Sequence, residues 1–195
     1  MLRGAAPLKP HPTAEAAFMG ALHERTLTKG QHLLREGDPG EAIFFVRSGL
    51  LRYYYSADGV EHTGQFFDEG TFVADVFALT SGAPSLQNIN ALEASEVIVI
   101  PLAAMMAAYD ADHGFERFGR RMMEAALAGS QRRTASLLKL SPAARYRRFV
   151  EMRPEVARRV PQYTIASYLG ITPEALSRIR RRRSGPTPSR EIPGG

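Results

Sequence analysis

Apolar positions in the segment Pro161–Arg183 recur at intervals of three and four residues, the spacing of one face of an α-helix. This pattern predicts a first helix over Gln162–Leu169. Gly170 breaks the pattern, and glycine readily adopts the positive φ with which many helices end. Thr172 can then cap a second helix, and Pro173 suits its first position, where a missing N–H costs nothing. Two helices joined by a tight turn form a helix-turn-helix.

The second helix would present a polar, basic face opposite its apolar residues. Glu174 and Arg178 suit base edges in the DNA major groove, because a carboxylate accepts from cytosine N4 and a guanidinium binds guanine O6 and N7. Thr172 and Ser177 are the next candidates for base contacts. Phosphate contacts are predicted from a further set: Tyr163, Thr164, Arg180, Arg181 and Arg182. The alternative is a helical hairpin with a solvated basic face, which the combination of turn, cap and arginines disfavours.

Between residues 27 and 100 the pattern changes to short apolar segments separated by turn signals rich in Gly and Asp. Six segments are predicted to be strands: Gln31–Glu36, Ala42–Arg47, Leu50–Ser56, His62–Phe67, Leu86–Leu92 and Glu96–Ile100. Short strands at this spacing are typical of an antiparallel sandwich or barrel. Short helices are expected before and after them, over Ala14–His23 and Leu102–Tyr109.

The longest helical stretch is Asp112–Leu138, which contains no proline. An apolar stripe spaced by three or four residues runs along it: Phe115, Phe118, Met122 and Ala126. Packing of this stripe against its own domain is one interpretation. We favour a two-fold contact between two copies of the chain, because proteins that read symmetric DNA sites are usually dimers. A further helix is expected over Pro142–Met152.

Charge is distributed unevenly along the 195 residues, although the net charge is only +5. Residues 53–116 contain ten acidic residues and no Lys or Arg, whereas residues 117–195 contain 18 basic and five acidic residues. We therefore expect a polyanionic partner for the C-terminal part alone. The chain has no Cys, no apolar run of membrane-spanning length and no signal-peptide pattern. These features favour a cytoplasmic protein without disulfides.

The C-terminal stretch YTIASYLGITPEALSRIRR, together with a set of turn and core residues upstream of it (Gly30, Gly37, Asp38, Phe44, Val46, Gly49 and Leu50), resembles the CRP/FNR family of bacterial transcription regulators. The resemblance covers roughly Leu27–Arg183. It implies an α+β fold in three parts: an antiparallel β-roll (jelly roll) sensor domain at 1–110, a long dimerisation helix at 111–140, and a helix-turn-helix domain with a disordered tail at 141–195.

The resemblance also implies partners and reader residues. In the family, a Glu and an Arg four residues apart commonly read bases, and Glu174 and Arg178 have that spacing. Pro173 stands where other members often carry a polar base reader, so the operator is expected to differ. The implied partners are double-stranded DNA, a second copy of the chain and RNA polymerase, with no membrane.

The sequence departs from the family at the cyclic-nucleotide site. Family members that bind cyclic nucleotides carry a phosphate-binding motif there that resembles Phe-Gly-Glu followed by Arg-[Ser/Thr]-Ala. Ala74 and Asp75 replace the Gly-Glu pair, and no arginine occurs near Pro84–Leu86. A buried cyclic phosphate needs a cation or several donors, so we expect no cofactor and no control by cyclic nucleotide. Arg47 and Arg52 lie outside the acidic stretch but could reach in from neighbouring strands.

Three residues of this region form a candidate pocket for another effector: Phe72, Asp75 and Phe77. Aromatic residues in such positions more often belong to a core. A haem ligand from His or Met stays an open alternative.

A cupin-like ligand-binding protein or metal-dependent enzyme with a nonspecific basic tail is the alternative from another class. His32 and His62 are the only histidines in the predicted roll, and no His-x-His motif occurs, which disfavours a metal site. No nucleophile–base pair, P-loop or dinucleotide motif is present, so we do not expect an enzyme.

Overall fold

The computed structural model describes residues 12–184, and the chain divides into an N-terminal unit, 1–139, and a C-terminal unit, 140–195. The tail predicted to be disordered lies outside the described residues from 185 onward. The predicted fold class is confirmed, with antiparallel sheets in the first unit and a helical second unit. No helix in the described part of the chain is long and apolar enough to cross a membrane.

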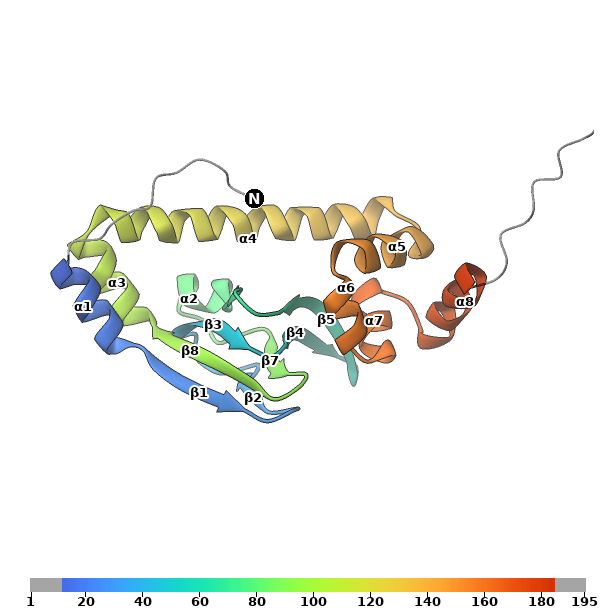
Figure 1. The fold of residues 1–195 in the computed structure, drawn as a ribbon, viewed down its shortest axis with the longest axis horizontal. Coiled ribbons are helices and arrows are strands. Elements are labelled where there is room, and N and C mark those ends of the chain that lie inside the picture. Colours follow the sequence, from blue (N-terminus) through green and yellow to red (C-terminus); the bar gives the residue numbers. More distant parts are fainter. Residues whose placement is uncertain (1–11, 185–195) are drawn as a thin grey trace, which may run out of the picture. The chain divides into compact units, whose positions relative to one another are not determined.

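Two four-stranded antiparallel sheets form the β-roll of the N-terminal unit (Figure 1). The first sheet runs in the order β1 (His23–Leu27), β8 (Ser95–Pro101), β3 (Ala42–Ser48) and β6 (Phe72–Val73). The second runs in the order β2 (His32–Leu34), β7 (Asn88–Ala91), β4 (Leu51–Ala57) and β5 (Val60–Phe67). Side chains alternate between the two faces of a strand, which lets both sheets contribute to one apolar core.

The core takes its largest contributions from β-branched and leucine side chains, as expected for strands that are buried on one face. Leu27, Val46, Leu51 and Ile89 are completely buried in it. The side chain of Tyr53 packs against this core from β4.

A β-bulge between β4 and β5 explains a glycine in the middle of a strand. Tyr53 pairs with Gln65 and Tyr54 with Thr63, so Gly64 is the extra residue. The ring of Tyr53 lies directly on Gly64, because a Cβ added there would fall 1.8 Å from Tyr53 Cε2. Only glycine therefore fits beneath this ring.

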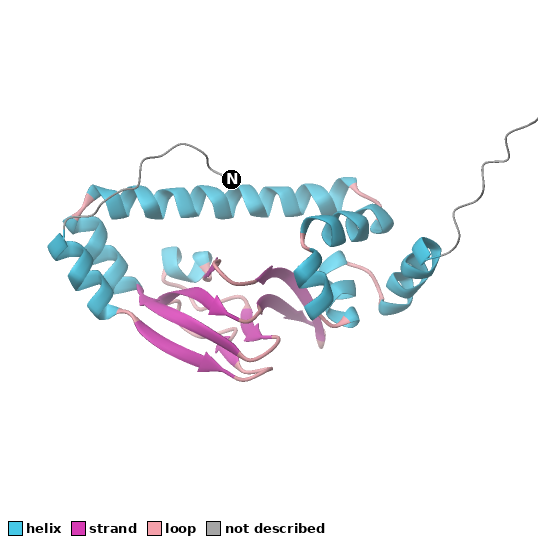
Figure 2. Ribbon diagram, in the orientation of Figure 1, coloured by secondary structure: helices cyan, strands magenta, loops and turns pink. Residues whose placement is uncertain are grey.

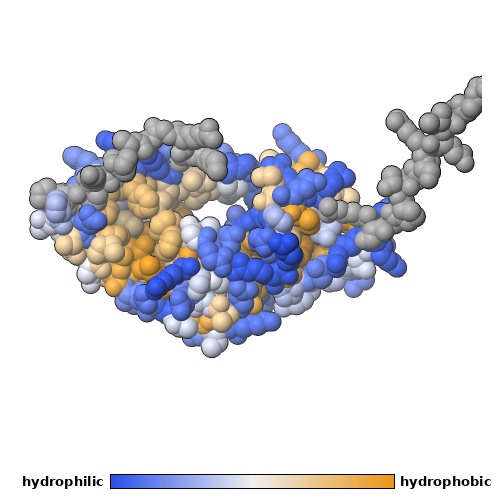
Figure 3. All heavy atoms as spheres, in the orientation of Figure 1, coloured by the Kyte–Doolittle hydropathy of each residue, from blue (hydrophilic) through white to orange (hydrophobic). Residues whose placement is uncertain are grey.

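Four helices belong to the N-terminal unit: α1 (Pro12–Ala21), α2 (Val76–Ser81), α3 (Leu102–Ala111) and α4 (His113–Lys139). α3 contacts both α1 and α4; α1 and α3 lie at one end of the roll, and α4 runs from that end along the roll (Figure 1). Gly119 lets α4 approach α3 closely, since a Cβ at this position would lie 1.9 Å from the hydroxyl oxygen of Tyr109 on α3. Figure 3 shows apolar side chains gathered at this helical end of the unit.

The C-terminal unit contains α5 (Pro142–Met152), α6 (Pro154–Arg159), α7 (Gln162–Leu169) and α8 (Pro173–Ser184), drawn as short cyan helices in Figure 2. Ser141 caps α5, because its Oγ accepts from the N–H of Ala144 at 3.3 Å. Residues from all four helices form the core of this unit: Phe149, Val156, Ile165, Leu169 and Leu176.

The pattern-based prediction misses the shortest elements. The sequence predicts an N-terminal helix that extends to His23. In the structure this helix ends at Ala21, and His23 begins β1, which pairs with β8. Four of the five residues of β1 are exposed, so hydrophobicity gives no strand signal there. β6, α2 and α6 were also not predicted, and each has between two and six residues.

Candidate DNA-binding surface and effector region

The turn between α7 and α8 has the geometry that the sequence predicted. Gly170 ends α7 with φ of 65°, and its N–H donates to the carbonyl of Ser167 at 3.0 Å. Thr172 caps α8, because its Oγ1 accepts from the N–H of Ala175 at 3.3 Å. Pro173 is the first residue of α8, where its lack of an N–H removes no helical bond.

One face of each helix in this pair is buried. Ala166 on α7 is completely buried, and Ile165 and Leu176 are each 1% exposed. Arg145, on α5, fixes the end of α7 from the side. Its Nε donates to the carbonyl of Leu169 at 2.9 Å, satisfying one of the free carbonyls at a helix C-terminus. Sequence reasoning did not find this role, because nothing in the spacing distinguishes Arg145 from neighbouring arginines.

The outward side of α8 forms a shallow hollow of about 390 Å³. We call it the reader hollow, and its lining is Pro173, Glu174, Ser177, Arg178 and Arg181. Hydrogen bonds from its own backbone N–H and from Thr172 lower the pKa of Glu174, and Arg178 lowers it further. Glu174 is therefore an ionised acceptor at neutral pH, next to a permanent cation four residues on.

The predicted phosphate residues have different environments. Tyr163 is 63% exposed, and Arg180, Arg181 and Arg182 are exposed as well. Arg180 lines a second hollow, of about 260 Å³, beside α5 and α6, whereas Arg181 lines the reader hollow. The prediction for Thr164 is wrong, because its side chain is completely buried and cannot reach a phosphate.

The candidate effector residues do not share one environment. Asp75 is 5% exposed, and both of its carboxylate oxygens are engaged, one by the N–H of Ala78 at 3.2 Å and the other by the hydroxyl of Ser85 at 2.6 Å. Asp75 is thus the N-cap of α2. Phe77 is 47% exposed, whereas Phe72 packs against Phe118 of α4 with ring centroids 5.8 Å apart.

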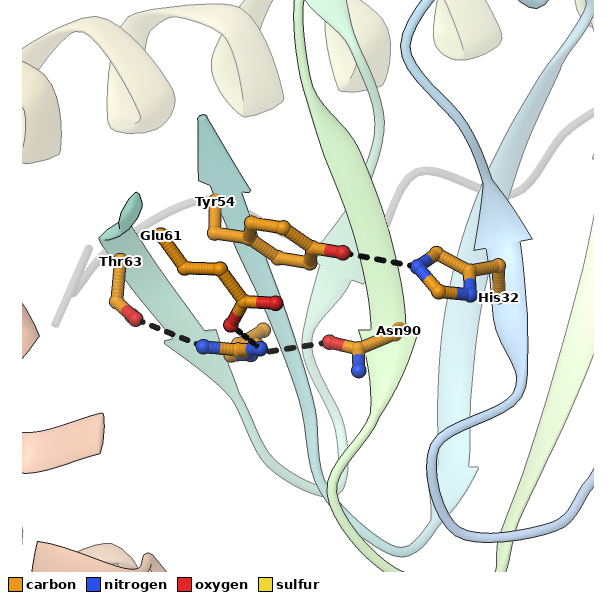
Figure 4. Close-up of polar contacts among 6 residues, drawn as sticks. His32, Tyr54, Glu61, Thr63 and Asn90 are labelled. Atoms are coloured by element: carbon orange, nitrogen blue, oxygen red, sulfur yellow. Dashed lines mark hydrogen bonds and ion pairs between the residues drawn. The ribbon is translucent and has the colours of Figure 1, made fainter. Parts of the chain in front are cut away.

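Arg52 is the buried cation of the roll, and Figure 4 shows its polar partners. Its Nε donates to Asn90 Oδ1 at 3.0 Å, its Nη1 donates to Thr63 Oγ1 at 3.2 Å, and its Nη2 forms an ion pair with Glu61. The guanidinium also lies 4.3 Å from the centre of the Tyr54 ring. All three nitrogens are therefore engaged on the second sheet.

This network lies on the outer face of the second sheet, because Leu51 and Tyr53 turn their side chains to the core and Arg52 alternates with them. His32 on β2 extends the network, with its Nε2 2.9 Å from the hydroxyl of Tyr54 (Figure 4). Burial lowers the pKa of His32, and nearby Arg35 lowers it further. Sequence reasoning missed this network, since its members come from four strands.

The four residues predicted to form the dimer contact have different environments. Phe115 packs against Phe18 of α1 with ring centroids 4.9 Å apart, and Phe118 packs against Phe72, both inside the N-terminal unit. Met122 is half-buried and Ala126 is exposed.

Another stripe of exposed residues runs beside Ala126 along α4. Its members lie four, three, four and three residues apart: Met123, Leu127, Ser130, Thr134 and Leu137. Its three large apolar members are 43%, 61% and 41% exposed, respectively. This alternation is the a/d spacing of a two-stranded coiled coil.

Within residues 12–184, no group of three or more His, Asp or Glu side chains is placed to hold a metal ion.

Known proteins resemble this chain both in one domain family and in fold. A model of the cyclic nucleotide-binding domain family matches residues 24–112. None of the curated proteins matches the chain in sequence. Among solved structures, FixK2 from Bradyrhizobium japonicum is 21% identical, with a TM-score of 0.70 over 83% of each chain.

Two further structures extend the likeness. CLP, described as a c-di-GMP responsive global regulator of Xanthomonas campestris, is 16% identical, with a TM-score of 0.69 over 89% of this chain and 91% of CLP. A protein of Eubacterium rectale assigned to the Crp/Fnr family of transcriptional regulators is also 16% identical, with a TM-score of 0.71 over 88% of this chain and 82% of its own.

Residues 24–112 of the N-terminal unit thus match the model of the cyclic nucleotide-binding domain family. Taken over both units, the chain has the fold of CRP/FNR regulators, as the sequence pattern predicted.

Proposed function

We propose that this protein is a sequence-specific, DNA-binding regulator of transcription and not an enzyme. The observation that carries the proposal is the reader hollow, in which a carboxylate, a hydroxyl and two guanidinium groups project from one exposed helix face. Glu174 and Arg178 have the chemistry to read cytosine and guanine in the major groove. The concentration of basic residues in the C-terminal part supplies the attraction for phosphates. The known functions of proteins with this fold support the same proposal.

Selection of bound sequences from random duplex DNA, with purified protein and no added ligand, tests this function. The expected product is an inverted repeat with half-sites about one helical turn, roughly 34 Å, apart. A parallel selection with Arg178→Ala should relax one base position. Recovery of no preferred sequence by the unmodified protein would refute the proposal.

The proposed regulator acts as a homodimer through α4. Met122 and Ala126 of the predicted stripe, together with Met123, Leu127 and Leu137, form one side of this helix. Two copies joined along that side would give the two-fold symmetry that an inverted-repeat operator requires. Phe115 and Phe118 would then support the contact indirectly, by fixing the start of α4 on its own unit.

The same proposal includes independence from cyclic nucleotide. Asp75 replaces the family's glutamate, and its oxygens are already engaged by Ala78 and Ser85. Arg52 is fully engaged on the outer face of its sheet, and Arg47 forms an ion pair with Glu24. Arg52, the buried cation that could have reached the phosphate from a neighbouring strand, is therefore held by other partners.

A further inference from the structure

One residue of the reader hollow differs in chemistry from the other four. Glu174, Ser177, Arg178 and Arg181 each carry donors or acceptors that match polar groups on a base or phosphate. The side chain of Pro173 has neither a donor nor an acceptor, and its backbone has no N–H. Pro173 is therefore the only one of these five side chains that is entirely apolar.

Pro173 also occupies a position from which bases are read. It is exposed, and it is the first residue of α8. In helix-turn-helix proteins the N-terminal residues of the second helix contact base edges. The pyrrolidine ring fixes φ, and Thr172 fixes the start of the helix by accepting from Ala175 N through Oγ1 and from Leu176 N through its carbonyl at 3.0 Å. The ring is therefore held in place, unlike the long side chains beside it.

The major-groove edges of the bases offer one apolar group, the C5-methyl of thymine. A proline ring placed against a polar group of a base would displace water without replacing its hydrogen bond, which is unfavourable. Placed against the methyl group, the same ring buries apolar surface on both sides. We propose that Pro173 is a specificity-determining residue that recognises a thymine methyl group beside the base read by Glu174. This inference rests on the proposed function of α8.

Replacement of thymine by deoxyuridine tests the contact, because the two bases differ only in the methyl group. On the selected operator, single replacements in one half-site should reveal a position where affinity falls about fourfold, the effect of one buried methyl group. Replacing both symmetric thymines should square this loss. For Pro173→Ser, the replacement should have no effect at that position. Arg182→Ala is the matched control, which should bind more weakly overall but keep the fourfold ratio.

The outcomes separate this inference from the proposed function. If selection yields no preferred sequence, both are refuted. If the protein selects an inverted repeat but no thymine shows methyl dependence, only the role of Pro173 is refuted. Persistence of the methyl effect in Pro173→Ser would place the methyl reader elsewhere and also overturn the inference. Pro173→Ala provides a second variant. Its ratio of affinities for the thymine and deoxyuridine operators should lie between the ratios of the unmodified protein and of Pro173→Ser.

Discussion

Arg178 and Arg182 lie one turn apart on α8, and only Arg178 lines the reader hollow. We expect Arg178→Ala to lower affinity for the selected operator about tenfold or more and to relax one base position, because a bidentate contact with guanine is lost. Arg182→Ala should weaken binding to all sequences alike and flatten its dependence on salt. Fluorescence anisotropy with operator and scrambled duplexes at several salt concentrations measures both effects. An unchanged sequence preference in Arg178→Ala would remove it from the readers.

Thr164 is fully buried, and within the described residues its hydroxyl is the one buried side-chain polar atom without a hydrogen-bond partner. Thr164→Val keeps the shape and removes the hydroxyl, so the free energy of unfolding should rise by about 1 kcal/mol. Operator affinity should stay the same, whereas the loss of a phosphate contact would lower it. Thermal unfolding and a binding titration provide the two measurements. Thr164→Ser, which keeps the hydroxyl and deletes the methyl group, should instead destabilise the unit.

At the scale of elements, α4 presents the stripe that contains Met123, Leu127 and Leu137. Leu127→Glu should raise the dimer dissociation constant about a hundredfold, because each copy loses apolar burial and the two carboxylates repel each other. Affinity for the operator should fall as the dimer dissociates. Analytical ultracentrifugation at micromolar concentration gives the distribution of species.

Ala135→Glu is the matched control, since it adds the same charge to the same helix at an exposed position outside the stripe. That variant should remain dimeric. A monomeric unmodified protein, or equal dissociation of both variants, would contradict the proposed interface.

Sequence reasoning was most successful for long elements with a clear period. The apolar period of α4 and the glycine, cap and proline of the helix-turn-helix are local signals, and the structure retains them. β1 and β6 gain their structure from pairing with β8 and β3, which local sequence does not encode. Arg52 shows the same limit at a candidate site. Its partners depend on the register across three strands, β7, β4 and β5, and on the bulge at Gly64, so spacing alone could not have predicted them.

At the scale of the whole molecule, His32 makes stability depend on pH. Its pKa is lower in the folded protein than the ordinary value of 6.5, so the unfolded chain binds a proton more readily. The contribution of His32 to stability is therefore fully present above pH 6.5 and is lost as the pH decreases through the lowered pKa. His32→Gln should lose less thermal stability than the unmodified protein between pH 7.5 and about pH 5. His62→Gln, which changes an exposed histidine on β5, is the control and should behave like the unmodified protein.

Control by a ligand is also a property of the whole molecule. Titration calorimetry with cyclic AMP and cyclic GMP should show no binding in the micromolar range, because residues 53–116, which include the region of the family's cyclic-nucleotide site, contain no Lys or Arg. Operator affinity should be the same with and without either nucleotide. A low-micromolar dissociation constant accompanied by a matching rise in operator affinity would show that other donors replace the family's arginine.

The hydrogen bond from Ser85 to Asp75 has a consequence for protein engineering. Ser85 lies in the segment where the family carries its arginine, and its hydroxyl also occupies one oxygen of the Asp75 carboxylate. A single substitution, Ser85→Arg, would therefore introduce the missing cation and release that oxygen in the same step. Asp75, in the place of the family's glutamate, would then supply the carboxylate of such a site. A search for an effector-responsive version of the proposed regulator can thus begin with a single substitution rather than with a redesigned domain.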